Sequence, residues 1–366
     1  MTNTYVPPKG SLNSPYIFVG EQPGRNEVLH RELGPFSGPA GKNLQECLHA
    51  AGILWSDCYR TNVIKDLDYP LDSYIEIRNR KNAGATFTKM GEAYVAELKN
   101  ELLRTAGNII IACGNVALWT LCSRLGITHW RGSVLDSSLL PGRKVLPIIH
   151  PATWTQEKLH ANPDAYLNKY LCILDLKKAA IEKNFKEIRS LPRKLSIHPT
   201  YYEACNFIST CMEYANAGAT IDYDIEVQPH NQELSCIGLA FDSSWAMCIP
   251  FVGPQGDYFS VEQELNIVLL LDKLFSNPKW AKRGQNVIFD SHYMLKKYGI
   301  RTHNLHDTMI AQSILYPEMR KALEFITSMW TDIPYYKHDG KQFLGGITNW
   351  EKAWQYNCLD TLSTAD

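Results

Sequence analysis

The chain has 366 residues, of which 37 are Lys or Arg and 38 are Asp or Glu, so its formal net charge is −1. This balance excludes a protein that binds nucleic acid through bulk positive charge and restricts any such binding to local basic clefts. Hydrophobic residues make up 45% of the chain, which is enough for two packed domains of ordinary size.

Compartment can be inferred from the N-terminus and the cysteines. The segment 1–16 has no apolar stretch of the kind found in signal peptides, and no apolar run reaches the length of a membrane span. The 10 cysteines form no C-x-x-C pair, and most lie in apolar runs, which is typical of reduced, buried thiols. We therefore expect a cytoplasmic protein that does not associate with membranes.

Strand and helix patterns alternate in the first half of the chain. The strands are expected at 16–20, 58–65, 108–114 and 144–151, and the helices at 41–53, 91–107 and 115–126. This alternation predicts an α/β fold with a mostly parallel sheet. A lysine-rich helical stretch with a following proline then predicts a basic helical linker at 177–195, which gives a first domain at 1–176.

The second domain, expected at 196–366, begins with three closely spaced strands. These strands, at 219–227, 234–242 and 245–251, predict an antiparallel meander. The expected helices after them are 260–277, 289–299, 307–317 and 348–366.

Two acidic residues stand out in the first of these strands. Asp224 and Glu226 share one face of the strand because side chains alternate, while Ile225 points to the opposite face. Two carboxylates so placed repel each other, and a divalent cation such as Mg²⁺ or Mn²⁺ would remove that repulsion. A solvated edge strand that carries D-x-E without a metal is the alternative at this point.

Further carboxylates occur later in the chain. Asp290 follows "GQNVIF" at a junction from strand to helix, and Tyr356 and Asp360 lie four residues apart, hence on one face of a helix. Thr348 and Glu351 form a possible capping box at the start of that helix.

The three motifs together resemble those of DnaQ-like 3′–5′ exonucleases, which have an RNase H-like mixed-sheet α/β fold. Within that group, "GQNVIFD", "LKKYGI" and "DTMI" resemble the proofreading domain of family A DNA polymerases, over roughly 195–366. The resemblance implies two divalent ions held by Asp224, Glu226 and Asp360. Asp290 would bind the second ion partly through water, and Tyr356 would orient the attacking water.

Two rival interpretations remain for this domain. Ribonucleases of the RNase D type carry the same D-x-E and Y-x-x-x-D motifs, so the substrate could be RNA. A non-catalytic DNA-binding scaffold is the rival from another class. His306 and Asp307 are expected to cap the N-terminus of a helix rather than to bind metal.

The glycine-rich segment after the first strand, "GEQPGRNEVLHRELGPFSGPAGKNL" (20–44), fits neither a Walker A motif nor a G-x-G-x-x-G fingerprint. It is similar to motif one of the uracil-DNA glycosylase superfamily, family 4 type. Matches to later motifs follow in order: "TNVIK" (61–65), "ACGNVAL" (112–118), "RG" (131–132) and "HPATW" (150–154). The similarity covers about 14–175 and implies an α/β/α sandwich around a parallel sheet.

The resemblance also implies roles in base flipping. Phe36 would stack on the flipped base, Asn62 would read its Watson–Crick edge, Glu21 would position a water, and His150 would hydrogen-bond uracil O2. Other uracil- or DNA-binding candidates are Gln22, Gly38, Gly41 and Arg131. Taken singly, Phe36 and His150 also fit ordinary core residues, and Asn62 fits a turn residue.

One departure from the family concerns its cofactor. Family 4 enzymes carry a four-cysteine iron–sulfur cluster, but segment 1–46 contains no cysteine, so no cluster is expected. The domain could thus be an altered glycosylase that binds uracil without excising it.

The whole chain is interpreted as a phage-like fusion acting on single-stranded 3′ ends of DNA, with uracil in some of them. It would work in the host cytoplasm with a polymerase, as a further domain or a separate chain.

Overall fold

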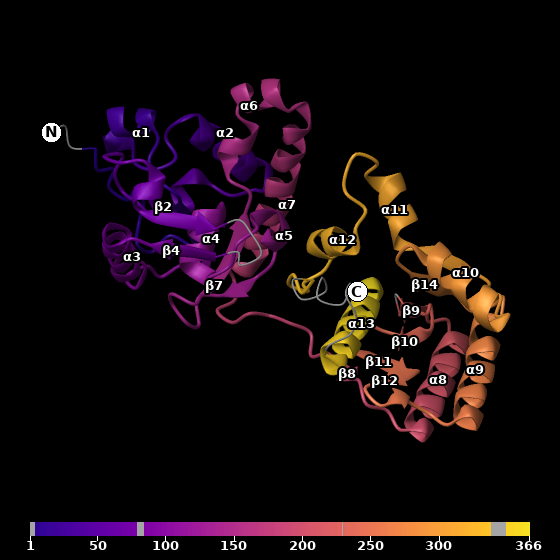
Figure 1. The fold of residues 1–366 in the computed structure, drawn as a ribbon. Coiled ribbons are helices and arrows are strands. Elements are labelled where there is room, and N and C mark those ends of the chain that lie inside the picture. Colours follow the sequence, from indigo (N-terminus) through magenta and orange to yellow (C-terminus); the bar gives the residue numbers. More distant parts are fainter. Residues whose placement is uncertain (1–3, 79–83, 229, 338–348) are drawn as a thin grey trace. The chain divides into compact units, whose positions relative to one another are not determined.

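The computed structural model describes residues 4–78, 84–228, 230–337 and 349–366 (Figure 1). Its contacts divide the chain into two compact units, Met1–Arg189 (unit 1) and Ser190–Asp366 (unit 2). The expected linker at 177–195 therefore begins too early. Residues 177–182 belong to helix α7 (Leu167–Glu182), which is tied to unit 1 because Glu182 forms a buried ion pair of 2.7 Å with Lys144. Within the described residues, no helix combines the length and apolar character that a membrane crossing needs.

Unit 1 contains a five-stranded sheet with the order β2-β1-β5-β7-β6, in which only β6 runs antiparallel to its neighbour. The strands are β1 (Tyr16–Gly20), β2 (Cys58–Asn62), β5 (Ile109–Cys113), β6 (Leu135–Asp136) and β7 (Lys144–Ile148). The four strands expected from the sequence, and their parallel arrangement, are confirmed. Every residue of these four is buried, as expected for a parallel sheet that is covered on both faces.

Helices and a small hairpin surround this sheet. The helices are α1 (Arg25–Leu29), α2 (Pro39–Ala50), α3 (Lys89–Leu102), α4 (Asn115–Cys122), α5 (Ile127–Trp130), α6 (Gln156–Ala161) and α7; the hairpin is β3 (Ile75–Arg78) and β4 (Gly84–Phe87). The expected helices correspond to α2, α3 and α4, whereas the hairpin and the short helices were not predicted. The ends of β1, β2 and β7 lie at the same edge of the sheet, where ligands of open α/β sheets bind.

Unit 2 contains a six-stranded mixed sheet with the order β15-β14-β9-β10-β11-β8. The strands are β8 (Lys194–Ser196), β9 (Ile221–Val227), β10 (Leu234–Ala240), β11 (Trp245–Pro250), β14 (Lys282–Gly284) and β15 (Leu305–Asp307), with a separate small hairpin of β12 (Val252–Gly253) and β13 (Gly256–Asp257). The antiparallel meander β9-β10-β11 is confirmed, and the other pairings in the large sheet are parallel.

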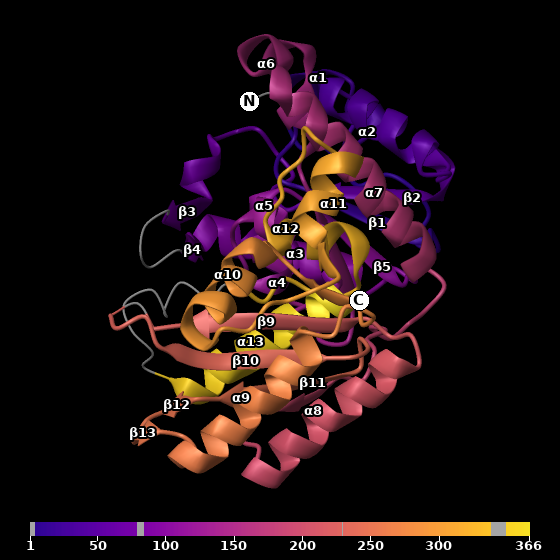
Figure 2. The ribbon, with the colours of Figure 1, turned by 90° about the vertical axis from the view of Figure 1, so that its right-hand side faces the viewer.

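The described residues of unit 2 form six helices beside this sheet: α8 (Tyr201–Asn216), α9 (Val261–Phe275), α10 (Val287–Tyr298), α11 (Thr308–Leu315), α12 (Leu323–Trp330) and α13 (Trp350–Ala365). Figure 2 shows α8 and α9 on one face of the sheet and α13 on the other. Helix α13 is capped by Asn349, whose side chain accepts from the Lys352 N–H. The expected capping residue Thr348 lies outside the described residues.

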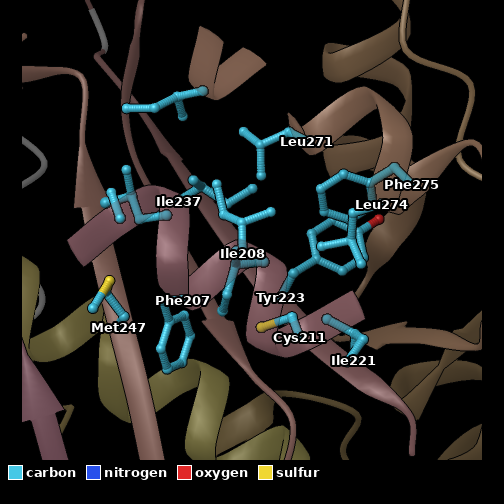
Figure 3. Close-up of a cluster of buried hydrophobic side chains, with 14 of the residues drawn as sticks. Phe207, Ile208, Cys211, Ile221, Tyr223, Ile237, Met247, Leu271, Leu274 and Phe275 are labelled. Carbon is cyan, nitrogen blue, oxygen red and sulfur yellow. The ribbon is translucent and has the colours of Figure 1, made fainter. Parts of the chain in front are cut away.

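Successive side chains along β9 point to opposite faces of the sheet. Tyr223 and Ile225 enter a large apolar cluster with α8 and α9, and Figure 3 shows Tyr223 beside Leu274 and Phe275. The opposite face of the sheet packs a second cluster against Trp354 of α13. The side chains of β9 that alternate with the core residues therefore point toward α13.

Candidate active sites

Three carboxylates converge between β9 and α13. Asp224 and Glu226 occupy the face of β9 opposite to the large apolar cluster, and Asp360 projects from α13, which packs on this strand. One oxygen from each of the three carboxylates lies within 4.8 Å of the others, and Asp360 is buried. The sequence prediction that these three side chains share a site agrees with this geometry.

The electrostatics of the cluster favour bound cations. Burial raises the pKa of Asp224, and the neighbouring Glu226 raises it further. Burial also raises the pKa of Glu226 to about 7, with Asp360 as a second cause. Hard oxygen donors that converge and repel one another are the ligands preferred by Mg²⁺ and Mn²⁺. The donor set therefore fits divalent ions of this kind.

Asp290 lies beside this cluster rather than within it. Its side chain on α10 is buried, and Oδ1 accepts a hydrogen bond of 3.0 Å from the Ile225 N–H of β9. Burial raises its pKa to about 6. Among the described residues, the compact carboxylate group does not include Asp290. Its hydrogen bond to the Ile225 N–H ties the side chain to β9.

Two residues that the sequence did not single out contact Asp360. The Tyr336 hydroxyl donates to Oδ1 at 2.6 Å, and the Lys337 ammonium donates to Oδ2 at 2.8 Å. Lys337 also lies 5.2 Å from the centroid of the Tyr356 ring. Tyr356 itself, one turn before Asp360 on α13, is in hydrogen-bond contact with Lys337.

A third unpredicted residue holds Asp224. The Asn357 side-chain amide donates to Asp224 Oδ2 at 2.9 Å and to its backbone oxygen at 3.1 Å. Asn357 lies three residues before Asp360, so helical spacing to Asp360 would have indicated it.

The acidic residue at the start of α11 has the capping role expected for it. Asp307 accepts hydrogen bonds from the Met309 N–H at 2.8 Å and from the backbone of Asn286 and Val287. It thus fixes the beginnings of both α11 and α10, the helix that carries Asp290.

Unit 1 has a cavity of about 320 Å³ at the strand-end edge of its sheet. The lining residues are Gln22, Gly24, Arg25, Asn26, Glu27, Phe36, Gly38, Pro39, Ala40, Asn62, His150 and Ala152. The cavity therefore brings together segments from motif one, the end of β2 and the loop after β7. Of the sequence-predicted residues, it collects Gln22, Phe36, Gly38, Asn62 and His150.

A buried carboxylate shapes one wall of this cavity. Glu27 accepts a hydrogen bond of 2.9 Å from the Gly24 N–H and others from the backbone N–H groups of Phe36, Ser37 and Gly38. These bonds hold Phe36 in a left-handed conformation with φ of 61°, which non-glycine residues rarely adopt. The Phe36 ring is stacked against His150, with centroids 6.2 Å apart.

Two polar side chains that line the cavity together with Phe36 are uncharged donors. Burial lowers the pKa of His150 to about 4, and its Nδ1 accepts from the Ala152 N–H at 3.1 Å. His150 is therefore neutral near pH 7, with its proton on Nε2. The Asn62 Nδ2 is buried and has no hydrogen-bond partner among the described residues. Both groups thus offer N–H donors for a planar, uncharged ligand.

The sequence model of the uracil DNA glycosylase superfamily matches residues 7–175. The type-4 uracil-DNA glycosylase of Archaeoglobus fulgidus is 33% identical over 154 residues, which are 40% of this chain and 70% of that protein. That of Thermotoga maritima is 32% identical over 146 residues, 39% of this chain and 68% of that protein. The chain belongs to the uracil-DNA glycosylase superfamily.

The sequence model of a 3′–5′ exonuclease matches residues 205–366. Unit 2 is thus a DnaQ-like 3′–5′ exonuclease domain, which follows the glycosylase-like unit 1. Among solved structures, RNase D of Trypanosoma brucei with GMP is 12% identical, with a TM-score of 0.37 over 47% of this chain and 55% of that one. Escherichia coli RNase D is 15% identical, with a TM-score of 0.35 over 46% of this chain and 42% of that one.

Two further residues expected to bind uracil or DNA, Arg131 and Gly41, have close contacts within the fold. Arg131, in the "RG" motif of the superfamily, is 1% exposed, and its guanidinium forms a bidentate ion pair with Asp175 of α7. Gly41 lies beneath the cavity wall, where an added Cβ would fall 1.6 Å from the Phe36 carbonyl oxygen. The first residue joins α5 to α7, and the second permits the close approach of α2 to the Phe36 loop.

Gln22 and Glu21, the other two candidate residues from motif one, differ in whether they line the cavity. Gln22 lines it and is fixed by hydrogen bonds from its amide to the backbone oxygens of Asp66 and Tyr69. Glu21 is half-buried beside it, and burial raises the pKa of its carboxyl group. Glu21 does not contribute to the lining of the cavity.

Proposed function

We propose that unit 2 removes nucleotides from single-stranded 3′ ends of DNA with two Mg²⁺ or Mn²⁺ ions. The observation that supports this is the convergence of Asp224, Glu226 and Asp360 within 4.8 Å. These carboxylates would hold the ions, which supply charge stabilisation at the phosphate and an activated water when bound.

The other site residues would prepare the reacting groups. Tyr356 shares a face of α13 with Asp360, and its hydroxyl would orient the attacking water toward the phosphorus. Asp290 is held by the Ile225 amide and would add a fourth negative charge on the β9 side, binding an ion partly through water. The leaving 3′ oxygen would depart on the side opposite to the attacking water.

We further propose that this nuclease proofreads for a family A DNA polymerase, present as a further domain or as a separate chain. The similarity of "GQNVIFD", "LKKYGI" and "DTMI" to proofreading domains supports this. In the test, 5′-labelled primers with a mispaired or a paired 3′ end are incubated with Mg²⁺, beside single-stranded DNA and RNA of the same sequence. Faster shortening of the mispaired end is expected. Preferential shortening of the RNA would contradict the proposal and favour an RNase D-type activity.

For unit 1, we propose that the cavity binds a uracil flipped out of DNA and that the base is excised. Phe36 would stack on the ring, and the unpaired Asn62 amide would donate to O4, where cytosine carries a donor instead. The neutral His150 would donate Nε2–H to O2 and stabilise the negative charge that the ring acquires when the bond from C1′ to N1 breaks. Glu21 would position the water that bonds to C1′ and would take up its proton.

The experiment for unit 1 uses single-stranded DNA with one uracil, in EDTA to silence the nuclease. Release of free uracil and an alkali-labile break at that position are expected for the wild type and are lost in Asn62→Ala. Binding of this DNA without release of uracil would show that unit 1 recognises the base and does not excise it.

A further inference from the structure

We propose that Lys337 is a positioning residue of the nuclease centre, which fixes Asp360 and Tyr356 with a permanent positive charge and does not strengthen the binding of divalent ions. This inference rests on the proposed function of unit 2. Lys337 is not part of the D-x-E, N-x-x-x-D or Y-x-x-x-D motifs, and it follows α12 in an irregular segment.

The contacts of Lys337 join the two functional residues of α13. Its ammonium is 2.8 Å from Asp360 Oδ2 and 5.2 Å from the centroid of the Tyr356 ring. The side chain is only 17% exposed, so water screens this ion pair weakly. A single ammonium therefore sets the direction of a proposed metal ligand and of the tyrosine that would orient the water.

The neighbouring residue completes the hold on Asp360. The Tyr336 hydroxyl lies 2.6 Å from Asp360 Oδ1 and 2.8 Å from Ser363 Oγ. Both carboxylate oxygens of Asp360 are thus contacted from the side of residues 336–337, and rotation of the carboxylate would break both contacts. Each oxygen keeps a second lone pair with which it can bind a cation.

The charge of Lys337 distinguishes its effect from that of an ordinary supporting residue. Asn357 holds Asp224 with a neutral amide at 2.9 Å, which orients the carboxylate without repelling a cation. Lys337 orients Asp360 with a full positive charge, which repels a divalent ion at the same carboxylate. Loss of the side chain should therefore slow the reaction and leave ion binding equal or tighter, whereas general damage to the site would weaken both.

The test compares Lys337→Met and Lys337→Arg with the wild type, and Lys273→Met, an exposed lysine on α9, is the control. Calorimetric titration of the metal-free full chain with Mn²⁺ gives the affinity, and single-turnover cleavage of a labelled oligonucleotide at saturating Mn²⁺ gives the rate. We expect Lys337→Met to lower the rate about 10- to 100-fold, as loss of an outer contact to a metal ligand does. Its Mn²⁺ affinity should be unchanged or higher, and Lys337→Arg should recover much of the rate.

Thermal unfolding without metal shows whether each variant is folded, and Lys337→Gln replaces Lys337→Met if that variant is not. Weaker Mn²⁺ binding together with slower cleavage would overturn the proposal, because Lys337 would then only support the site. An unchanged rate would overturn it as well. Failure of the proposed function itself has a different signature, namely a wild type that binds no Mn²⁺ and shows no metal-dependent cleavage.

Discussion

The two sites of this chain handle charge in opposite ways. The cavity of unit 1 presents Phe36, a neutral His150 and the amide of Asn62, groups suited to a flat base without net charge. The centre of unit 2 gathers Asp224, Glu226 and Asp360, which repel one another until a cation compensates them. A site for an uncharged ring can be complete within the polypeptide, whereas a site for a phosphodiester is built around ions that the polypeptide only holds.

Burial acts on both sites in the same physical sense. It disfavours the charged form, and therefore it lowers the pKa of His150 to about 4 and raises that of Glu226 to about 7. In unit 1 the resulting neutral imidazole is the form that the proposed reaction uses. In unit 2 the resulting carboxylic acid is not, and a bound cation would have to displace the proton.

Removal of metal should separate the two activities most strongly. EDTA should slow the shortening of 3′ ends about a thousandfold or more, since the ions are proposed to lower the activation barrier by several kcal/mol. Release of uracil should persist in the same sample. The double variant Asp224→Ala, Glu226→Ala should reproduce the effect of EDTA in the presence of Mg²⁺. Loss of both activities in EDTA would refute the contrast between the sites.

The next largest effect is expected for the imidazole of unit 1. His150→Ala removes the donor to O2, and loss of one such donor slows related reactions about 10²- to 10³-fold. Uracil release is measured under single-turnover conditions in EDTA, with exposed His160→Ala as the control. The nuclease rate, measured separately with Mg²⁺, should not change. A rate equal to that of the control would show that His150 only packs against Phe36.

Loss of the neutral contact between Asn357 and Asp224 should have a smaller effect on the cleavage rate. Asn357→Leu removes the amide that holds Asp224, and we expect both the cleavage rate and the Mn²⁺ affinity to fall about tenfold. Gln355→Leu, an exposed change on the same helix, is the control. If Asn357→Leu instead left Mn²⁺ binding unchanged, the distinction drawn between Asn357 and Lys337 would lose its basis.

The smallest expected effect is a difference in pH dependence. Glu226 must lose its proton to bind a cation, so cleavage at low Mg²⁺ should rise as pH increases toward its pKa of about 7. Higher Mg²⁺ should shift this rise to lower pH, because ions compete with protons. Any increase in the rate of uracil release with pH would come from deprotonation of Glu21, since His150 is already neutral. The pH at which this increase occurs should not depend on the Mg²⁺ concentration. If higher Mg²⁺ shifted the pH profiles of both cleavage and uracil release, the two activities would not have separate sites.

Local periodicity explains what the sequence could predict. The alternation of β9 and the helical spacing of Tyr356 and Asp360 each place two side chains on one face, whatever the rest of the fold does. The parallel sheet of unit 1 and the meander of unit 2 follow from patterns of the same short range. These are the parts of the fold and of the nuclease centre for which sequence and structure agree.

Long-range contacts explain what the sequence missed. Lys337 and Tyr336 reach Asp360 from an irregular segment that has no periodic pattern. Arg131 matches a family motif, but its burial against Asp175, 44 residues later, cannot be seen in that motif. Glu27 lies in motif one, yet its four backbone hydrogen bonds depend on how the loop returns after Phe36.

The alternation along β9 also decides which genetic changes unit 2 can tolerate. Deletion of a single codon before Tyr223 would exchange the two faces of the strand, so that carboxylates would enter the apolar cluster and the domain would not fold. A missense change of Asp224 to Asn would remove one of three repelling charges and leave that cluster intact. A point mutation can therefore remove a proposed metal ligand within a folded chain, whereas deletion of one residue in the same strand would prevent the domain from folding.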